Sequence, residues 1–350
     1  MFVLIVEQER REPTEIDVGS LVYAVTFSTN GEHLVSGSRG GVEVWRVEDG
    51  KRTVTMKASE VACLAVSKDG KWIAAGTNLG EVLVWDTVTH AWTHEQVFQH
   101  KEDNVNVNGV DFSPDSSRLV SASANKTASI WDIATRNRVQ TLHHNDALFS
   151  AKYSPQGDRI ATATRDSVYI YDSSDGRLII DIKATVLPFY NAGVLWFNNH
   201  LFVLSDSKIV QVEASTGSLV GEWSVPDTQG YSCIALPKHG EFVVYSTNST
   251  VSFWNTATHT QLGHIQHPHE ILSIAVSPDD QLVALGGRDN KIILESLSRI
   301  IVSHMRCRCT GYLNNSPVTH DARPPLASKG KTSHLQPRLA SATTHPTPPQ

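Results

Sequence analysis

The chain has 350 residues, 40% of them apolar and 19% charged, a balance typical of a soluble globular protein that can bury a sizeable core. Its formal net charge of −6 excludes a chain that is basic throughout, so we expect neither nucleic acid nor a membrane as its partner. Four cysteines, Cys63, Cys233, Cys307 and Cys309, are too few for a disulfide scaffold. The apolar stretch 2–6 is too short for a signal peptide, which predicts a cytoplasmic protein, with a nuclear location as the alternative.

The first predicted strand covers residues 14–18 (TEIDV). Residues 14–28 align without gaps on residues 53–67, where a similar stretch precedes a repeated unit. The segment therefore matches the last strand of one unit, although it stands before the first unit of the chain.

Seven copies of one unit follow, at a period of about 40 residues. Each copy begins with an apolar stretch and a turn of the Ser-x-Asp-Gly type, as in VSKDG (66–70). About twenty residues later each copy reaches one characteristic position, usually an aromatic residue. In successive copies that position holds Trp45, Trp85, Trp131, Tyr171, Val212, Trp254 and Glu295. A repeat of this length predicts one supersecondary unit built seven times.

The second copy shows the strands expected within a unit. Residues 64–67, 72–77 and 82–86 alternate apolar and small side chains and are separated by KDGK and NLGE turns. Residues 95–99 (EQVFQ) supply a weaker fourth strand. Four antiparallel strands per unit, without helical periodicity, are typical of a propeller blade.

These units resemble WD40 repeats, and the resemblance covers residues 13–297. It implies an all-β fold, a seven-bladed β-propeller of four-stranded antiparallel blades, with an N-terminal strand that closes the ring. Residues 14–18 are then expected beside residues 291–296, where they cover an otherwise exposed sheet edge. Residues 300–305 could occupy the same edge, and the sequence leaves both pairings open.

The resemblance also implies a hydrogen-bonded set of Ser or Thr, Asp and His around each tryptophan, and this chain fills that set unevenly. The residues to which we give a structural role are Trp45, Trp85, Trp131, Tyr171, Trp254, His144, Asp166, His267 and Asp289. The fourth unit is the most complete, because Thr162 or Thr164 joins His144, Asp166 and Tyr171. We therefore expect apolar packing between blades to hold the ring, with blades five and seven the weakest.

The turn between the second and third strands is the candidate partner-binding region. In WD40 propellers these turns lie on one face around the central channel. The candidate partner-binding residues in them are Arg39, Asn78, Arg165, Thr247 and Arg288. Arginine suits bidentate binding of carboxylate or phosphate and is frequent at interface hot spots. The alternative is that these arginines are simply solvated.

Residues 186–204 (VLPFYNAGVLWFNNHLFVL) form the aromatic stretch of unit five. We expect a pair of core strands joined by a turn at Asn198–Asn199. An exposed Trp196 or Phe197 would instead indicate a partner site.

No pattern in the sequence predicts catalysis, a metal or a cofactor. The histidine-rich stretches 90–94 and 264–269 lack zinc-site spacing, and neither G-x-S-x-G nor a Walker motif occurs. Ser and Asp recur at equivalent places, which favours architecture because an active site is usually unique. An enzyme would instead place non-repeating polar residues with shifted pKa values at the central channel.

The chain is expected to divide into a propeller, residues 1–305, and a disordered basic tail, residues 306–350, rich in Pro, Ser and Thr. The tail holds six Lys or Arg against one acidic residue. Its abrupt onset also fits a mis-joined exon or a read-through segment.

The function expected from the resemblance is that of a non-catalytic scaffold or adaptor. It would act as a monomeric ring within a larger complex and bind other proteins or peptides. The alternatives are recognition of a ligand, a phosphopeptide or nucleic acid through the arginines, and an eroded or truncated gene product without a role of its own.

Overall fold

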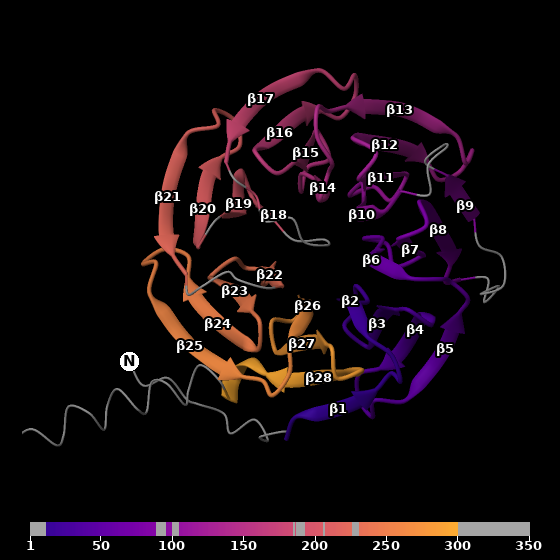
Figure 1. Cartoon of the computed structure of the whole chain (residues 1–350), viewed down its shortest axis with the longest axis vertical. Helices are drawn as coiled ribbons and strands as arrows, with labels where there is room; N and C mark the ends of the chain where they lie inside the picture. Colours follow the sequence, from indigo (N-terminus) through magenta and orange to yellow (C-terminus); the bar gives the residue numbers. More distant parts are fainter. Residues whose placement is uncertain are drawn as a thin grey trace, which may run out of the picture. The chain divides into compact units, whose positions relative to one another are not determined.

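The computed structural model describes residues 12–88, 96–99, 105–184, 186, 193–205, 207–225 and 231–299. Within these residues the chain forms seven four-stranded antiparallel sheets arranged as the blades of a ring (Figure 1). The first strand of each blade lies nearest the centre and the last lies at the rim. The expected seven-bladed, all-β propeller is confirmed.

The first six blades each use four consecutive strands. Blade one has β2 (Val22–Phe27), β3 (His33–Ser38), β4 (Gly41–Arg46) and β5 (Arg52–Met56). Blade two has β6 (Val61–Val66), β7 (Trp72–Thr77), β8 (Glu81–Asp86) and β9 (Gln96–Gln99). Blade three has β10 (Val107–Phe112), β11 (Arg118–Ser123), β12 (Thr127–Asp132) and β13 (Arg138–His143). Blade four has β14 (Ser150–Tyr153), β15 (Arg159–Ala163), β16 (Ser167–Asp172) and β17 (Leu178–Lys183). Blade five has β18 (Val194–Phe197), β19 (His200–Ser205), β20 (Lys208–Glu213) and β21 (Leu219–Ser224). Blade six has β22 (Ser232–Ala235), β23 (Phe242–Thr247), β24 (Thr250–Asn255) and β25 (Gln261–Gln266).

Blade seven joins the two ends of the ring. It contains β26 (Ile271–Val276), β27 (Leu282–Gly287) and β28 (Lys291–Ser296), and its fourth strand is β1 (Thr14–Asp17). β1 runs antiparallel to β28, with Ile16 opposite Ile292. Ile16 is buried, and Lys291 pairs with Glu15 across 2.6 Å. The N-terminal strand therefore closes the ring, as expected, and the competing segment 300–305 lies outside the described residues.

The repeated serine of each unit fixes the turn between the first two strands. In blade two, Ser67 Oγ donates to Asp69 Oδ1 at 2.6 Å and accepts the backbone N–H of Trp72 at 2.9 Å. The following glycine, Gly70, has φ of 72°, a conformation that favours glycine. Blade three repeats the arrangement, with Ser113 bonded to Asp115 at 2.5 Å. The recurrence of Ser and Asp is thus explained by turn geometry.

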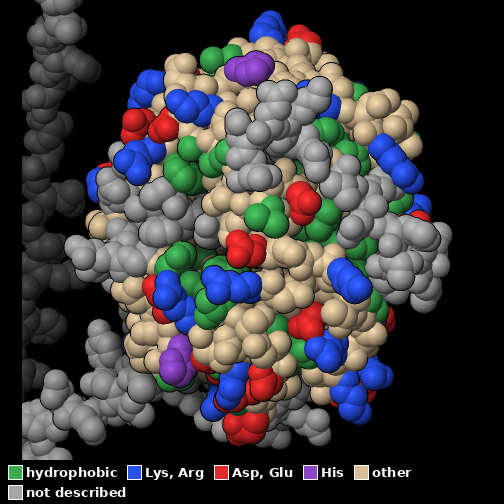
Figure 2. Space-filling model, turned by 45° about the vertical axis from the view of Figure 1, so that its right-hand side comes forward, with side chains coloured by type: hydrophobic (Ala, Val, Ile, Leu, Met, Phe, Trp, Pro, Cys, Tyr) green, Lys and Arg blue, Asp and Glu red, His purple; other side chains and the backbone are tan. Residues whose placement is uncertain are grey.

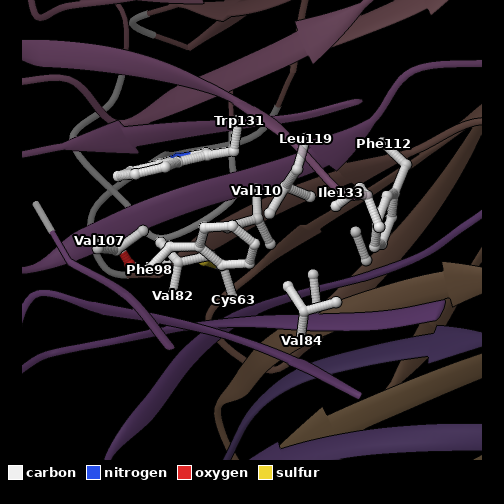
Figure 3. Close-up of a cluster of buried hydrophobic side chains, with 12 residues drawn as sticks. Cys63, Val82, Val84, Phe98, Val107, Val110, Phe112, Leu119, Trp131 and Ile133 are labelled. Carbon is white, nitrogen blue, oxygen red and sulfur yellow. Dashed lines mark hydrogen bonds between the residues drawn. The ribbon is translucent and has the colours of Figure 1, made fainter. Parts of the chain in front are cut away.

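The core of the ring consists of seven apolar clusters, one between each pair of neighbouring blades. Figure 3 shows the cluster between blades two and three, where Trp131 packs over Phe98 with ring centroids 5.2 Å apart. Cys63 and Val110 from the inner strands lie in the same cluster. Each third-strand aromatic residue thus packs on the blade before it, as Trp45 does on the β1–β28 pair.

Unit five folds as a blade despite its weak pattern. β18 and β19 pair antiparallel, with Phe197 opposite His200, so the expected turn at Asn198–Asn199 is confirmed. Trp196 and Phe197 are each half-buried. Within the described parts of the chain no helix is long and apolar enough to cross a membrane. The predicted tail, 306–350, lies outside the described residues.

Candidate interaction surfaces

The tryptophans of the third strands combine packing with an uneven set of hydrogen bonds. Trp45 Nε1 donates to Ser36 Oγ, and Trp131 Nε1 donates to Ser121 Oγ, both at 2.8 Å. Trp254 also lies in an apolar cluster, but its buried Nε1 has no hydrogen-bond partner among the described residues. Tyr245 stands there in place of the serine. Packing is therefore common to these indoles, whereas the serine bond is not.

Blade four brings together three of the four residues expected in its polar set. His144 Nε2 lies 2.9 Å from Thr162 Oγ1 and 3.0 Å from Tyr171 Oη. Asp166 is exposed, and His144 Nδ1 is buried without a hydrogen-bond partner in the described chain. Burial lowers the pKa of His144 to about 4, so the ring is neutral near pH 7. The aspartate thus does not complete the set.

Blade seven keeps a buried histidine and aspartate. His267 Nε2 lies 3.9 Å from Asp289 Oδ2, and both side chains are largely buried. His269 donates its backbone N–H to His267 Nδ1 at 3.1 Å. Glu295, in the tryptophan position, has its pKa raised by burial. The pair is therefore held inside the blade.

The turns between second and third strands lie at one end of the blades, together with the loops that lead into each blade. We call this end the top face. Arg39 and Arg165 are exposed there and form no ion pair with any described residue. Asn78 is half-buried, and its Oδ1 has no hydrogen-bond partner in the described part of the chain. Thr247 ends β23 and is buried.

Arg288 is the arginine of the top face with the most contacts. Its Nε lies 2.5 Å from Glu270 Oε2, and its guanidinium carbon lies 5.1 Å from the centre of the Tyr231 ring. Half of its side chain is still exposed. Tyr231 and Glu270 belong to the loops before blades six and seven, so three segments fix the guanidinium.

The charge of the top face is mixed. Asp166 follows Arg165 directly and is exposed, and Glu60 stands in the loop next to Arg39, whose carbonyl accepts its N–H at 3.5 Å. Figure 2 likewise shows Lys and Arg interspersed with Asp and Glu over the side of the molecule that it displays. A surface of this kind favours binding through individual side chains over attraction by a broad basic patch.

In the described part of the central channel lies an ion pair that no sequence pattern had indicated. Lys152 Nζ lies 3.5 Å from Asp111 Oδ1, and the backbone N–H of Tyr153 donates to Asp111 Oδ2 at 2.9 Å. Burial raises the pKa of Asp111, against the attraction of Lys152. The equivalent positions in neighbouring blades hold Ala65 and Leu195. Comparing the seven copies at this one position would have revealed the two charged residues.

The remaining reactive side chains have structural surroundings. Cys63 and Cys233 are buried free thiols, and burial raises the pKa of each to about 12. No group of His, Cys, Asp and Glu among the described residues could hold a metal ion. The histidine stretch 90–94 and the Cys307–Cys309 pair lie outside the described residues.

This geometry defines a seven-bladed β-propeller with a polar turn face. The family described as "WD domain, G-beta repeat" matches residues 17–46, 50–86, 92–132 and 257–294. The matches cover the first three strands of blades one, two, three and seven, and the last three matches also include the preceding outer strands β5, β9 and β25. Blades four to six have the same four-stranded sheet. The chain thus contains four matched WD40 repeats within a seven-bladed propeller.

Several curated proteins are similar to the chain. It is 22% identical over 305 residues to "Transcription factor unc-37" of Caenorhabditis elegans, and this match covers 81% of this chain and 48% of that protein. It is 24% identical over 190 residues to "Serine-threonine kinase receptor-associated protein" of Gallus gallus, covering 53% of each. It is 27% identical over 262 residues to "Protein groucho" of Drosophila melanogaster, covering 74% of this chain and 30% of that protein. The matches thus span about half of these relatives or less.

Proposed function

We propose that the propeller is a non-catalytic scaffold or adaptor that binds a protein or peptide on its top face. The candidate contact residues remain Arg39, Asn78, Arg165, Thr247 and Arg288. The observation that carries the proposal is the setting of Arg288, which Glu270 and Tyr231 hold in place while half of the side chain stays open. A preordered arginine beside an aromatic ring loses little side-chain entropy on binding, and Arg and Tyr are enriched among interface hot spots.

The names of the relatives support an interaction role. One is a kinase receptor-associated protein, and another, 22% identical over 284 residues, is "Transcriptional corepressor LEUNIG_HOMOLOG" of Arabidopsis thaliana. These names describe association and regulation. Relatives named as a transcription factor and as a small nucleolar RNA-associated protein favour the nuclear alternative over the cytoplasm as the place of action.

The contacts of the reactive side chains support the absence of catalysis. Asp111 is engaged by Lys152 and by the Tyr153 amide, so the channel pair is satisfied internally. The Cys233 thiol donates to the Leu272 carbonyl at 3.0 Å, and its raised pKa disfavours the thiolate that a nucleophile needs. We therefore assign the channel pair a structural role that joins blades three and four.

The test is quantitative affinity capture with the full chain. Wild type is compared with R39E/R288E and with R136E/R177E, a control that makes the same charge change in exposed turns at the opposite end of the blades. Proteins recovered with wild type and the control but lost with R39E/R288E support the proposal. Equal recovery with all three chains contradicts it.

Two other outcomes identify the alternatives. Recovery of nucleic acid, or of phosphorylated segments released steeply by salt, would favour recognition of phosphate through the arginines. Recovery of nothing specific would favour an eroded gene product. Thermal unfolding of each variant verifies that the ring is intact before binding is compared.

A further inference from the structure

A second surface lies at the opposite end of the ring, which we call the bottom face. It carries the turns between the first and second strands of each blade. A hollow of about 370 Å³ opens there where the inner strands of blades two to five end. Its apolar lining includes Pro114, Pro155, Leu195 and Trp196, and its cationic lining consists of Lys68 and Lys152. The hollow is large enough to receive one or two side chains of a partner.

Trp196 distinguishes this part of the ring from the other blades. It occupies the position that Phe112 and Tyr153 hold in blades three and four, since each stands opposite the second residue of its second strand. Phe112 and Tyr153 are buried, whereas Trp196 remains partly exposed. Its Nε1 donates to the Lys152 carbonyl at 3.2 Å, which fixes the indole at the edge of the hollow. An ordered, partly exposed indole can therefore contact an apolar side chain with little loss of entropy.

The charges around the hollow indicate which residues would flank that apolar side chain in a partner. Both charged residues in the described lining are lysines. Lys152 is held by Asp111 from the channel side, whereas Lys68 is exposed and forms no ion pair with a described residue. Asp69, next to Lys68 in the chain, accepts hydrogen bonds from Ser67 and Lys71. Lys68 is thus the charge available to a partner, and it attracts a carboxylate.

We propose that the hollow docks a short segment of a partner protein in which an aromatic or leucine side chain is flanked by aspartate or glutamate. The apolar side chain lies against Trp196, Leu195 and Pro155, and the flanking carboxylate pairs with Lys68. This site is independent of the top face, so the propeller can hold two partners at opposite ends of the ring.

The experiment selects random twelve-residue peptides displayed on phage against the full chain, then measures synthetic copies of the enriched peptides by fluorescence anisotropy. The test variants K68E and P155E change exposed side chains. The equivalent turn of blade two has Lys68 at the position of Pro155, so this type of turn does not require proline there. K238E is the matched control, because Lys238 is exposed in the corresponding turn of blade six, outside the hollow. R39E/R288E serves as a second control on the top face.

We expect peptides with an aromatic or leucine residue next to an acidic one. K68E and P155E should each weaken their binding by about tenfold or more, whereas K238E and R39E/R288E should bind as wild type does. Enriched peptides that bind K68E and P155E as tightly as wild type, peptides with basic flanks, or no enrichment at all would overturn the proposal. Because R39E/R288E is measured in parallel, failure here is distinguishable from failure of the top-face function.

Discussion

Trp131 donates its indole N–H to Ser121 Oγ across 2.8 Å, and both residues lie inside blade three. The same indole packs on Phe98 of the preceding blade. One side chain thus joins the hydrogen bonding within a blade to the apolar contact between blades. Replacing the serine therefore removes a buried hydrogen bond of the indole.

The first prediction compares two tryptophans. S121A should lower the free energy of unfolding by about 0.5–1.5 kcal/mol, because it removes the buried hydrogen bond between Ser121 Oγ and Trp131 Nε1. Replacing Trp254 by Phe should cost less than replacing Trp131 by Phe, since Trp254 Nε1 already has no hydrogen-bond partner among the described residues. Urea unfolding of the three variants measures the difference. Equal costs for the two Trp→Phe changes would show that the serine bond contributes nothing.

The second prediction concerns ring closure by β1. Ile16 is buried against the neighbouring strand, so I16A should destabilise the protein by about 2–4 kcal/mol. E15Q serves as the control in the same strand, because it removes only an exposed ion pair with Lys291 and should change stability little. If thermal unfolding gave the same midpoint for I16A and E15Q, β1 would not be needed to close the ring.

The third prediction is a pH dependence from His144. Its pKa is about 4 in the folded protein and about 6.5 when unfolded. The unfolded chain therefore takes up a proton between pH 6.5 and pH 4 that the folded chain does not. Stability should fall by up to about 3 kcal/mol across this window as the pH is lowered, and this contribution levels off below pH 4.

The variant H144Q isolates that effect. It should remove the His144 part of the pH dependence, so the difference in unfolding free energy between wild type and H144Q shrinks as pH falls from 6.5 to 4. The pKa of Asp115 is lowered by the hydrogen bond that it accepts from the Ser113 hydroxyl. Protonation of Asp115 therefore lowers the stability only at more acidic pH. A constant difference between the two proteins across the window would exclude a buried neutral His144.

The fourth prediction addresses the boundary between propeller and tail. Limited proteolysis of the native chain should cut first after residue 305, because the tail composition lacks the apolar periodicity of a packed segment. Mass spectrometry of the fragments locates the cut. Early cleavage within blade five or blade seven would instead agree with the expectation that these blades are the weakest. Resistance of residues 306–350 to the protease would contradict a disordered tail.

The fold was predictable because each unit repeats the same alternation of apolar and small residues and the same turn. A copy with a weak pattern can therefore be recognised by its alignment with the stronger copies. The alignment of residues 14–18 on 53–67 indicated a pairing with blade seven, but residues 300–305 remained an alternative that the sequence did not exclude. The contacts of Arg288 were not predictable, because Tyr231 and Glu270 approach it from two other loops. Nor could the sequence show that Asp166 is exposed, since a matching position does not determine where a side chain points.

The central claim is that the top face binds a protein partner through Arg288, which the fold holds in place. The most direct measurement is the dissociation constant of one captured partner for wild type, R288E and E270Q. We predict that R288E weakens binding by about tenfold or more, and that E270Q, which removes the carboxylate that holds the arginine in place, weakens binding by a smaller factor. Unchanged affinity in R288E, with the ring still folded, would contradict the claim.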